Sequence, residues 1–162
     1  MKVAIDSNIF FFCFKSNRED IKPADVQRTL NHLSQAPKVK LYVPISVIGE
    51  IVIECLKGSE SRKPGSSYNL EDLHNMIDLW GKLNLAFLYP NELVANVCYF
   101  LTKQKDPRLT DTDRVHLCYA LAYGMNYLLT ADQNLKHCVP DGCKLELIGI
   151  DEARAIVAKS KG

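Results

Sequence analysis

Short apolar segments alternate along the chain with longer segments in which apolar residues repeat at helical spacing. A short apolar run is typical of a buried strand, whereas apolar residues three or four positions apart indicate a helix with one buried face. Strands are therefore predicted at 2–6, 39–43, 85–89, 126–130 and 145–150. Helices are predicted at 7–14, 24–34, 45–56, 70–82, 91–103 and 111–124, with a last helix capped by Asp151. This alternation predicts an α/β fold in which a mostly parallel sheet carries helices on both faces.

Residues that favour helix ends set the predicted boundaries. Ser7 or Asn8 is expected to be the N-cap of the first helix. Gly58 is expected to end the third helix, because glycine commonly follows the last helical turn. Asn69 and Asp72 have the spacing of a capping box, which predicts where the fourth helix begins.

Length and composition predict one domain, spanning residues 1–162, with a proper hydrophobic core. Of the 162 residues, 47% are hydrophobic and 24% are charged, which are ordinary values for a globular protein. The six cysteines include no CxxC pair, and several fall in apolar runs, where a free thiol packs as a small hydrophobic residue. Reduced thiols, and apolar runs too short to span a membrane, favour a cytoplasmic protein.

Four acidic residues stand beside apolar segments of the predicted elements: Asp6, Glu50, Asp113 and Asp132. The carboxyl ends of parallel strands line one crevice, so acids at such places are expected to meet. Two carboxylates about 4 Å apart repel by roughly 4 kcal/mol at an effective dielectric of 20, and a cluster therefore needs a divalent cation or raised pKa values. Oxygen ligands select Mg²⁺ or Mn²⁺. The pattern predicts a metal-dependent phosphodiesterase centre.

Each of the four acids could also have a purely structural role instead of binding a metal. Two of them have an acidic neighbour that could bind the metal in their place. Asp6 ends the first strand, where an acid often caps the next helix, although Ser7 and Asn8 are available as caps. Glu50 borders an apolar stripe, where a glutamate is commonly just solvated, and Glu54 one helical turn later is a competing candidate. The choice between these two glutamates stays open.

The other two acids stand where helix caps are common. Thr110 and Asp113 have capping-box spacing, and Asp111 between them is an alternative or supporting ligand. Asp132 could cap the short turn that follows its strand. The case for a site depends on all four acids recurring at positions that one edge of an α/β fold brings together. Because the acids repel, Asp6→Asn is expected to keep the fold and even to stabilise the metal-free protein.

The formal net charge of +1 does not by itself indicate a nucleic-acid partner. Without the four acids, 20 basic residues face 19 − 4 = 15 acidic ones, a net charge of +5 that is compatible with a polyanionic substrate. Arg62 and Lys63 lie in a loop rich in glycine and serine and could contact phosphates, although two charges in a solvated loop are common.

Four motifs resemble, in the same order, those of the PIN-domain family of ribonucleases. They are Val3–Asn8, Pro44–Glu50, Asp113–Ala122 with Gly124 behind it, and Leu128–Leu135. The likeness runs from Val3 to about Ile150, and the motifs are weak singly but fairly specific as a series. It implies a three-layer α/β/α PIN-like fold with four to five strands, of the kind found in VapC-like prokaryotic toxins.

The resemblance also implies a function. Asp6, Glu50, Asp113 and Asp132 would bind one or two Mg²⁺ or Mn²⁺ ions, and a metal-activated water would cleave single-stranded RNA. The residues that would support these ligands are Ser7, Asn8, Thr130 and Asp111. Many small prokaryotic members are toxins that pair with an antitoxin and form homodimers, so both kinds of partner are expected.

Other proteins also begin with a strand-ending aspartate. A haloacid-dehalogenase-type phosphatase needs a second acid two residues later, where this chain has Asn8. A response-regulator receiver needs paired acids near its start and a lysine at a later strand end, which this pattern does not contain. The remaining alternative is a catalytically weak PIN-like module that binds RNA or protein.

Overall fold

Five parallel strands form one sheet in the computed structural model of the protein, which describes residues 1–15, 19–60, 68–103, 109–132 and 134–160. The strands are β1 (Lys2–Ile5), β2 (Lys40–Pro44), β3 (Leu85–Leu88), β4 (Tyr127–Leu129) and β5 (Glu146–Ile148). The helices are α1 (Ser7–Phe12), α2 (Pro23–Gln35), α3 (Ile45–Glu60), α4 (Leu70–Lys82), α5 (Glu92–Lys103), α6 (Asp111–Ala122) and α7 (Ile150–Ser160), with a 3-10 turn η1 (Asn134–Cys138). Each predicted strand and helix is present. Arg62 and Lys63, the expected phosphate contacts, lie outside the described residues.

The strand order β3-β2-β1-β4-β5 places β1 at the centre of the sheet. From β1 the chain builds outward to β3 on one side, and it then adds β4 and β5 on the other. An open α/β sheet forms its ligand crevice at such a reversal, beyond the carboxyl ends of the strands. Here the reversal lies between β1 and β4, whose register sets Ile5 opposite Leu129. Asp6 and Thr130 therefore leave the sheet side by side.

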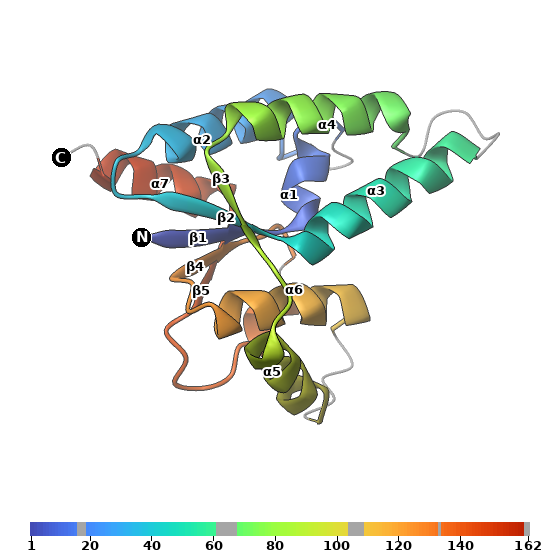
Figure 1. The fold of residues 1–162 in the computed structure, drawn as a ribbon. Coiled ribbons are helices and arrows are strands. Elements are labelled where there is room, and N and C mark those ends of the chain that lie inside the picture. Colours follow the sequence, from blue (N-terminus) through green and yellow to red (C-terminus); the bar gives the residue numbers. More distant parts are fainter. Residues whose placement is uncertain (16–18, 61–67, 104–108, 133, 161–162) are drawn as a thin grey trace.

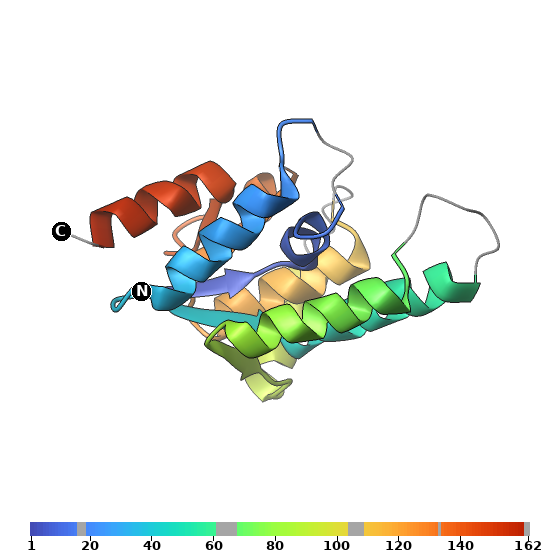
Figure 2. The same ribbon diagram turned by 90° about the horizontal axis from the view of Figure 1, so that it is seen from above.

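Successive side chains of a strand point to opposite faces of the sheet, and each face has its own core. On β1, Val3 and Ile5 pack with α1, α2, α3, α4 and α7, while Ala4 packs with α5 and α6. Figure 1 shows these two groups of helices on opposite sides of the sheet, and from above α7 lies beside α2 and α4 beside α3 (Figure 2). The predicted three-layer α/β/α arrangement is confirmed.

The helix α3 does not end at Gly58 as predicted. It continues to Glu60, because its buried residues Val47, Ile51 and Cys55 hold the helix against the core and glycine in a helix costs only about 1 kcal/mol. The next helix begins where predicted, since Asn69 and Asp72 form both hydrogen bonds of a capping box. None of the described helices is both long and apolar enough to cross a membrane.

Candidate metal centre

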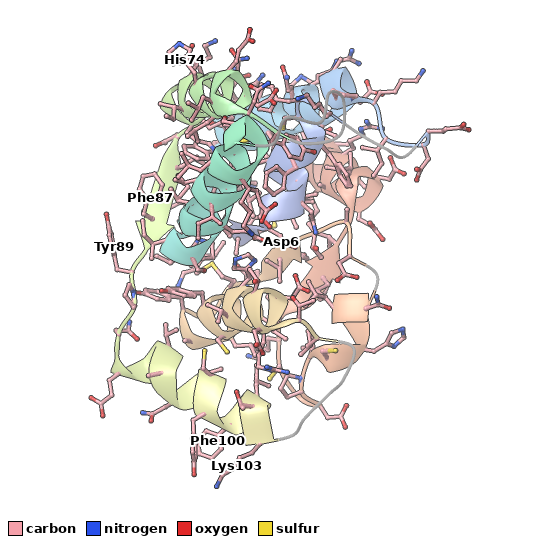
Figure 3. The ribbon with its side chains drawn as sticks, turned by 90° about the vertical axis from the view of Figure 1, so that its right-hand side faces the viewer. Asp6, His74, Phe87, Tyr89, Phe100 and Lys103 are labelled. Carbon is pink, nitrogen blue, oxygen red and sulfur yellow. The ribbon has the colours of Figure 1, made fainter. Side chains whose placement is uncertain are left out.

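The candidate site lies beyond the carboxyl ends of β1 and β4, between α1, α3 and α6 (Figure 3). Asp6 follows β1 directly, and Asp132 comes three residues after the end of β4. Glu50 lies in the second turn of α3, and Asp113 lies in the first turn of α6. The charges of Asp6 and Asp113 act on the pKa of Glu50, and those of Asp6 and Asp132 act on the pKa of Asp113, so the fold brings all four acids into one neighbourhood.

The carboxylate of Asp6 is completely buried and accepts four hydrogen bonds. Its Oδ1 accepts from the backbone N–H of Ser7 and from Nδ1 of His116, both at 2.8 Å. Its Oδ2 accepts from Nδ2 of Asn8 at 2.8 Å and from the hydroxyl of Thr130 at 2.7 Å. A carboxylate offers about four lone-pair positions, so all of them are taken by protein donors.

These contacts correct the predicted role of the residues around Asp6. Asp6 itself is the N-cap of α1, rather than Ser7 or Asn8, because its side chain already lies over the first free N–H of the helix. Burial raises the pKa of Asp6, but the hydrogen bond and charge of His116, with the hydrogen bonds of Thr130 and Ser7, outweigh burial and lower it. Asp6 is therefore held ionised by the protein alone.

His116 is the residue of this site to which the sequence analysis assigned no role. It lies on α6, is completely buried, and joins two of the acids: Nδ1 faces Asp6, while Nε2 lies 3.7 Å from Oε2 of Glu50. Burial lowers the pKa of His116, but Asp6, Glu50 and Asp113 together raise it above its usual value. The available signal was an ionisable residue one turn after Asp113 among apolar neighbours.

Glu50, rather than Glu54, faces the cluster. Oε2 of Glu50 is buried and has no hydrogen-bond partner among the described residues. Burial raises the pKa of Glu50, as do the charges of Asp6 and Asp113, while a hydrogen bond with Ser7 and the charge of His116 act in the opposite direction. The side chain of Glu54 is 44% exposed and accepts a hydrogen bond from Lys57 at 2.8 Å.

Asp113 combines a helix cap with a place in the cluster. Its backbone N–H donates to the hydroxyl of Thr110 at 3.2 Å, and that hydroxyl donates to Oδ2 of Asp113 at 2.6 Å. Burial raises the pKa of Asp113, and the charges of Asp6 and Asp132 raise it further. The side chain of its neighbour Asp111 is 98% exposed and accepts a hydrogen bond from Arg114 at 2.7 Å, so Asp111 lies at the surface and not among the buried acids.

Asp132 lies at the rim of the site. Its backbone N–H donates to the hydroxyl of Thr130 at 3.1 Å, and its Oδ1 accepts from the backbone N–H of Asn134 at 2.8 Å. The carboxylate thus caps the turn η1, while its charge reaches Asp113. Thr130 connects the rim to the buried end of the site, because it also donates to Asp6.

The donors of this site fit a divalent cation. One ligand atom from each of Asp6, Asp113 and His116 lies within 4.8 Å of the others. Two buried polar atoms that face this group, Oε2 of Glu50 and Nε2 of His116, have no hydrogen-bond partner among the described residues. A buried polar atom without a partner costs about 1–3 kcal/mol. A cation between these atoms would supply the missing interaction and would oppose the repulsion that raises the pKa values of Glu50 and Asp113.

We expect the metal-free protein to lose stability as the pH rises from about 5 to 8. Glu50, Asp113 and His116 have raised pKa values in the folded state. Their contribution to the free energy of unfolding is fully present below their ordinary values of 4.5, 3.8 and 6.5, and is lost as the pH rises through the folded values. Asp6, with a lowered pKa, loses its contribution only in stronger acid.

Thermal unfolding across this range, with and without Mn²⁺, checks the expectation. Metal ligands must be deprotonated to bind, so the stabilisation by Mn²⁺ should grow as the pH rises. A metal-free melting temperature that increases steadily from about pH 5 to 8 would contradict the assigned directions.

No protein-family model matches the sequence, and no curated protein matches it either. Solved structures do resemble the chain over nearly its whole length. A chain of VapBC2 from Rickettsia felis, solved with a DNA fragment from its promoter, matches with a TM-score of 0.65 at 15% identity, covering 92% of this chain and 98% of that chain. A chain of VapBC-1 from nontypeable Haemophilus influenzae matches with a TM-score of 0.61 at 21% identity, covering 93% and 99%.

A chain of FitAcB from Neisseria gonorrhoeae also matches, with a TM-score of 0.58 at 12% identity, covering 91% of this chain and 97% of that chain. Identities this low establish a common fold and do not carry residue roles from one protein to another. The resemblance first seen in the four motifs is confirmed at the level of architecture. The chain has the three-layer PIN-like fold of these VapC-type structures.

Proposed function

We propose that the protein is a Mg²⁺- or Mn²⁺-dependent endoribonuclease that cleaves single-stranded RNA as the toxin of a toxin–antitoxin pair. The observation that carries this proposal is the buried, unpartnered Oε2 of Glu50 inside a group of acids at the carboxyl edge of a parallel sheet. Among the described residues, only His116 offers this oxygen an opposite charge, at 3.7 Å, and no residue offers it a hydrogen bond. The carboxylate of Glu50 is suited to bind a cation that would also bind the phosphate of the substrate.

The residues of the site favour direct attack by water over a covalent intermediate. A bound divalent ion would lower the pKa of a water molecule and neutralise charge on the scissile phosphate. The hydroxyls of Ser7 and Thr130 are buried and hydrogen-bonded to Glu50 and Asp6, and the hydroxyl of Thr110 is held by Asp113 at the start of α6. They are therefore positioning groups and do not reach a phosphate outside.

An open pocket of about 480 Å³ leads from Glu50 along the surface between α3 and α6. Lys57 lines it on the α3 side and Asp111 on the α6 side. The phosphates of RNA are negatively charged, so proteins bind RNA largely through basic side chains. Lys57 lies where it can contact such a phosphate. Arg62 and Lys63, which follow α3 in the sequence, remain proposed contacts of the same strand.

Exposed apolar side chains support a protein partner as well. Phe87 and Tyr89, at the edge strand β3, are labelled in Figure 3 with Phe100 of α5, and all three are more than two-fifths exposed. Large exposed apolar residues that gather on one side of a molecule commonly mark a binding surface. We propose an antitoxin protein and a second copy of this chain as the partners, in keeping with the complexes named for the similar structures.

The proposed activity is tested by incubating the purified protein with single-stranded RNA, duplex RNA and single-stranded DNA. We expect cleavage of single-stranded RNA that requires Mn²⁺ or Mg²⁺, stops in EDTA and returns with excess Mn²⁺. Asp113→Asn should reduce cleavage at least about a hundredfold, because even a residue that only supports a metal ligand is worth ten- to a hundredfold. Asparagine can still accept the hydrogen bond from Thr110, so the helix cap is kept.

Asp78→Asn is the matched control, since Asp78 is an exposed residue of α4 that lies 4.0 Å from the exposed His74. It should cleave like the unchanged protein. Metal-independent cleavage would point to a contaminating nuclease or a different mechanism. Binding of RNA without cleavage in either metal would favour the alternative of a PIN-like binding module.

A further inference from the structure

A second pocket, of about 420 Å³, borders the candidate metal centre and shares no residue with the pocket beside Glu50. It opens between the first turns of α2 and α7, two helices that lie side by side (Figure 2). Thr130 and Ala131 line it on the side of the centre, where the Thr130 hydroxyl donates to Asp6 at 2.7 Å and the Ala131 N–H donates to Asn8 at 3.0 Å. The pocket has the size of a small-molecule site and adjoins the acids.

The lining of this pocket suits an uncharged group with a polar edge better than it suits a phosphate. The charged residues that line it are four acids and two basic residues: Asp20, Asp25, Asp151, Glu152, Lys22 and Arg154. The excess of negative charge repels a phosphate. Ile21 and Ile150 add apolar surface to the same wall. A flat ring that carries hydrogen-bonding groups on its edge, such as a nucleobase, matches this combination.

Arg154 and Asp25 lie close together in the pocket without a hydrogen bond between them. Nη2 of Arg154 is 3.7 Å from Oδ2 of Asp25, and Oδ1 of Asp25 is 3.5 Å from Nη1 of Arg28, so both contacts are longer than hydrogen bonds. The guanidinium is held by two other bonds, because Nε donates to Thr29 at 3.2 Å and Nη1 donates to Asp151 at 3.1 Å. These bonds fix the guanidinium and leave one donor on Nη1 and two on Nη2, beside a carboxylate that can still accept.

Guanine is the RNA base whose edge matches this pair of groups. Along that edge it offers two neighbouring acceptors, N7 and O6, followed by two neighbouring donors, N1–H and the N2 amino group. A guanidinium donates two hydrogen bonds to O6 and N7, which is the commonest specific contact of arginine with a base. A carboxylate accepts two parallel hydrogen bonds. No other RNA base has two neighbouring donor atoms, so no other base can bind both oxygens of the carboxylate.

We propose that this pocket is a guanine subsite, in which Arg154 donates to O6 and N7 and Asp25 accepts from N1 and N2 of a nucleotide close to the scissile phosphate. Single-stranded RNA suits such a subsite, because its bases can be unstacked and bound by their edges. The inference rests on the proposed ribonuclease and gives that enzyme a base preference. If Arg154 only clamps α2 to α7 through Thr29 and Asp151, all bases should bind alike.

The test measures how tightly the purified full chain binds short uridine oligomers that carry one central guanosine, adenosine or cytidine. Fluorescence anisotropy in EDTA gives each affinity without cleavage. The guanosine oligomer should bind at least about tenfold more tightly than the others. Arg154→Lys should abolish this preference, because lysine keeps the charge but lacks the planar fork of arginine. Arg28→Lys is the matched control and should keep the preference, since Arg28 also pairs with Asp25 but is not among the residues that line the pocket.

A guanosine preference that depends on Arg154 would support the subsite even if no oligomer is cleaved in Mn²⁺, in which case the proposed nuclease alone fails. Cleavage in Mn²⁺ with equal binding of all oligomers would overturn the subsite and leave the nuclease standing. A preference for another base, or one that survives Arg154→Lys, would overturn the subsite as well. Should Arg154→Lys not fold, Asp25→Asn takes its place and should also lose the preference, because asparagine keeps only one acceptor oxygen.

Discussion

Replacing Glu50 with glutamine should abolish metal-dependent RNA cleavage and, at the same time, make the metal-free protein more stable. Glutamine has the shape of glutamate without its charge, so it removes a metal ligand while filling the same space. Cleavage should fall at least about a hundredfold, for the reason that even outer partners of a metal site are worth ten- to a hundredfold. The stabilising effect follows from the raised pKa of Glu50, which burial and the charges of Asp6 and Asp113 produce.

A glutamine amide at this position can also donate to the unpartnered Nε2 of His116, now 3.7 Å from Oε2 of Glu50. We expect the melting temperature of the metal-free protein to rise by roughly 2 to 4 °C, the shift that about 1 kcal/mol produces in a chain of this size. Cleavage falls while stability rises because, without a bound cation, the acids of the cluster repel one another and destabilise the fold.

Thermal unfolding in EDTA and cleavage in Mn²⁺ measure the two effects on one preparation. Glu54→Gln is the matched control, because Glu54 lies one turn along α3 and bonds to Lys57 in solvent. It should leave both the cleavage rate and the melting temperature close to those of the unchanged protein. Loss of cleavage in Glu54→Gln with full activity in Glu50→Gln would show that Glu54 is the metal ligand and would refute the arrangement described.

The sheet and the convergence of the acids were predictable because both depend on local patterns. Short apolar runs mark the strands, and parallel strands carry whatever follows their carboxyl ends to one edge. Asp6 and Asp132 follow β1 and β4, which are neighbours in the sheet. That both residues leave the sheet at the same edge therefore required only the correct strand order.

The choice between Glu50 and Glu54 could not be made in the same way. Residues four apart lie on the same side of a helix, so helical periodicity treats them alike. The packing of α3 against α6 distinguishes the two glutamates, because it places His116 next to Glu50, whereas Glu54 forms an ion pair with Lys57. That packing is a contact between segments more than 60 residues apart in the sequence.

The roles of Asp6 and His116 were hidden for a related reason. A local pattern treats an acid after a strand as either a cap or a ligand, and Asp6 caps α1 while also binding three side chains. His116 stands among apolar residues of α6, where its polar role appears only once β1 and α6 are packed together. Four acids alone predict mutual repulsion, and the buried histidine changes that balance.

This balance reverses the expected effect of Asp6→Asn on the fold. Repulsion among four acids predicted that the substitution stabilises the metal-free protein, but Asp6 accepts four hydrogen bonds and pairs with a buried histidine. Asparagine keeps one acceptor oxygen and places an NH₂ group against donors that the second oxygen served. Removing one partner of a buried ion pair typically costs about 3–5 kcal/mol. We expect a loss of about 3 kcal/mol and a melting temperature lower by roughly 6 to 12 °C.

Chemical unfolding of the metal-free protein checks this expectation, with Asp78→Asn as the control for the loss of an exposed acid. An unchanged or raised stability of Asp6→Asn would mean that repulsion from Glu50 and Asp113 outweighs the four hydrogen bonds. If the loss is found, inactivity of Asp6→Asn no longer identifies a metal ligand, because a partly unfolded site is inactive whatever Asp6 does. Glu50 and Asp113 are then the positions at which charge can be removed with the fold intact, and activity measured there reports on the ion itself.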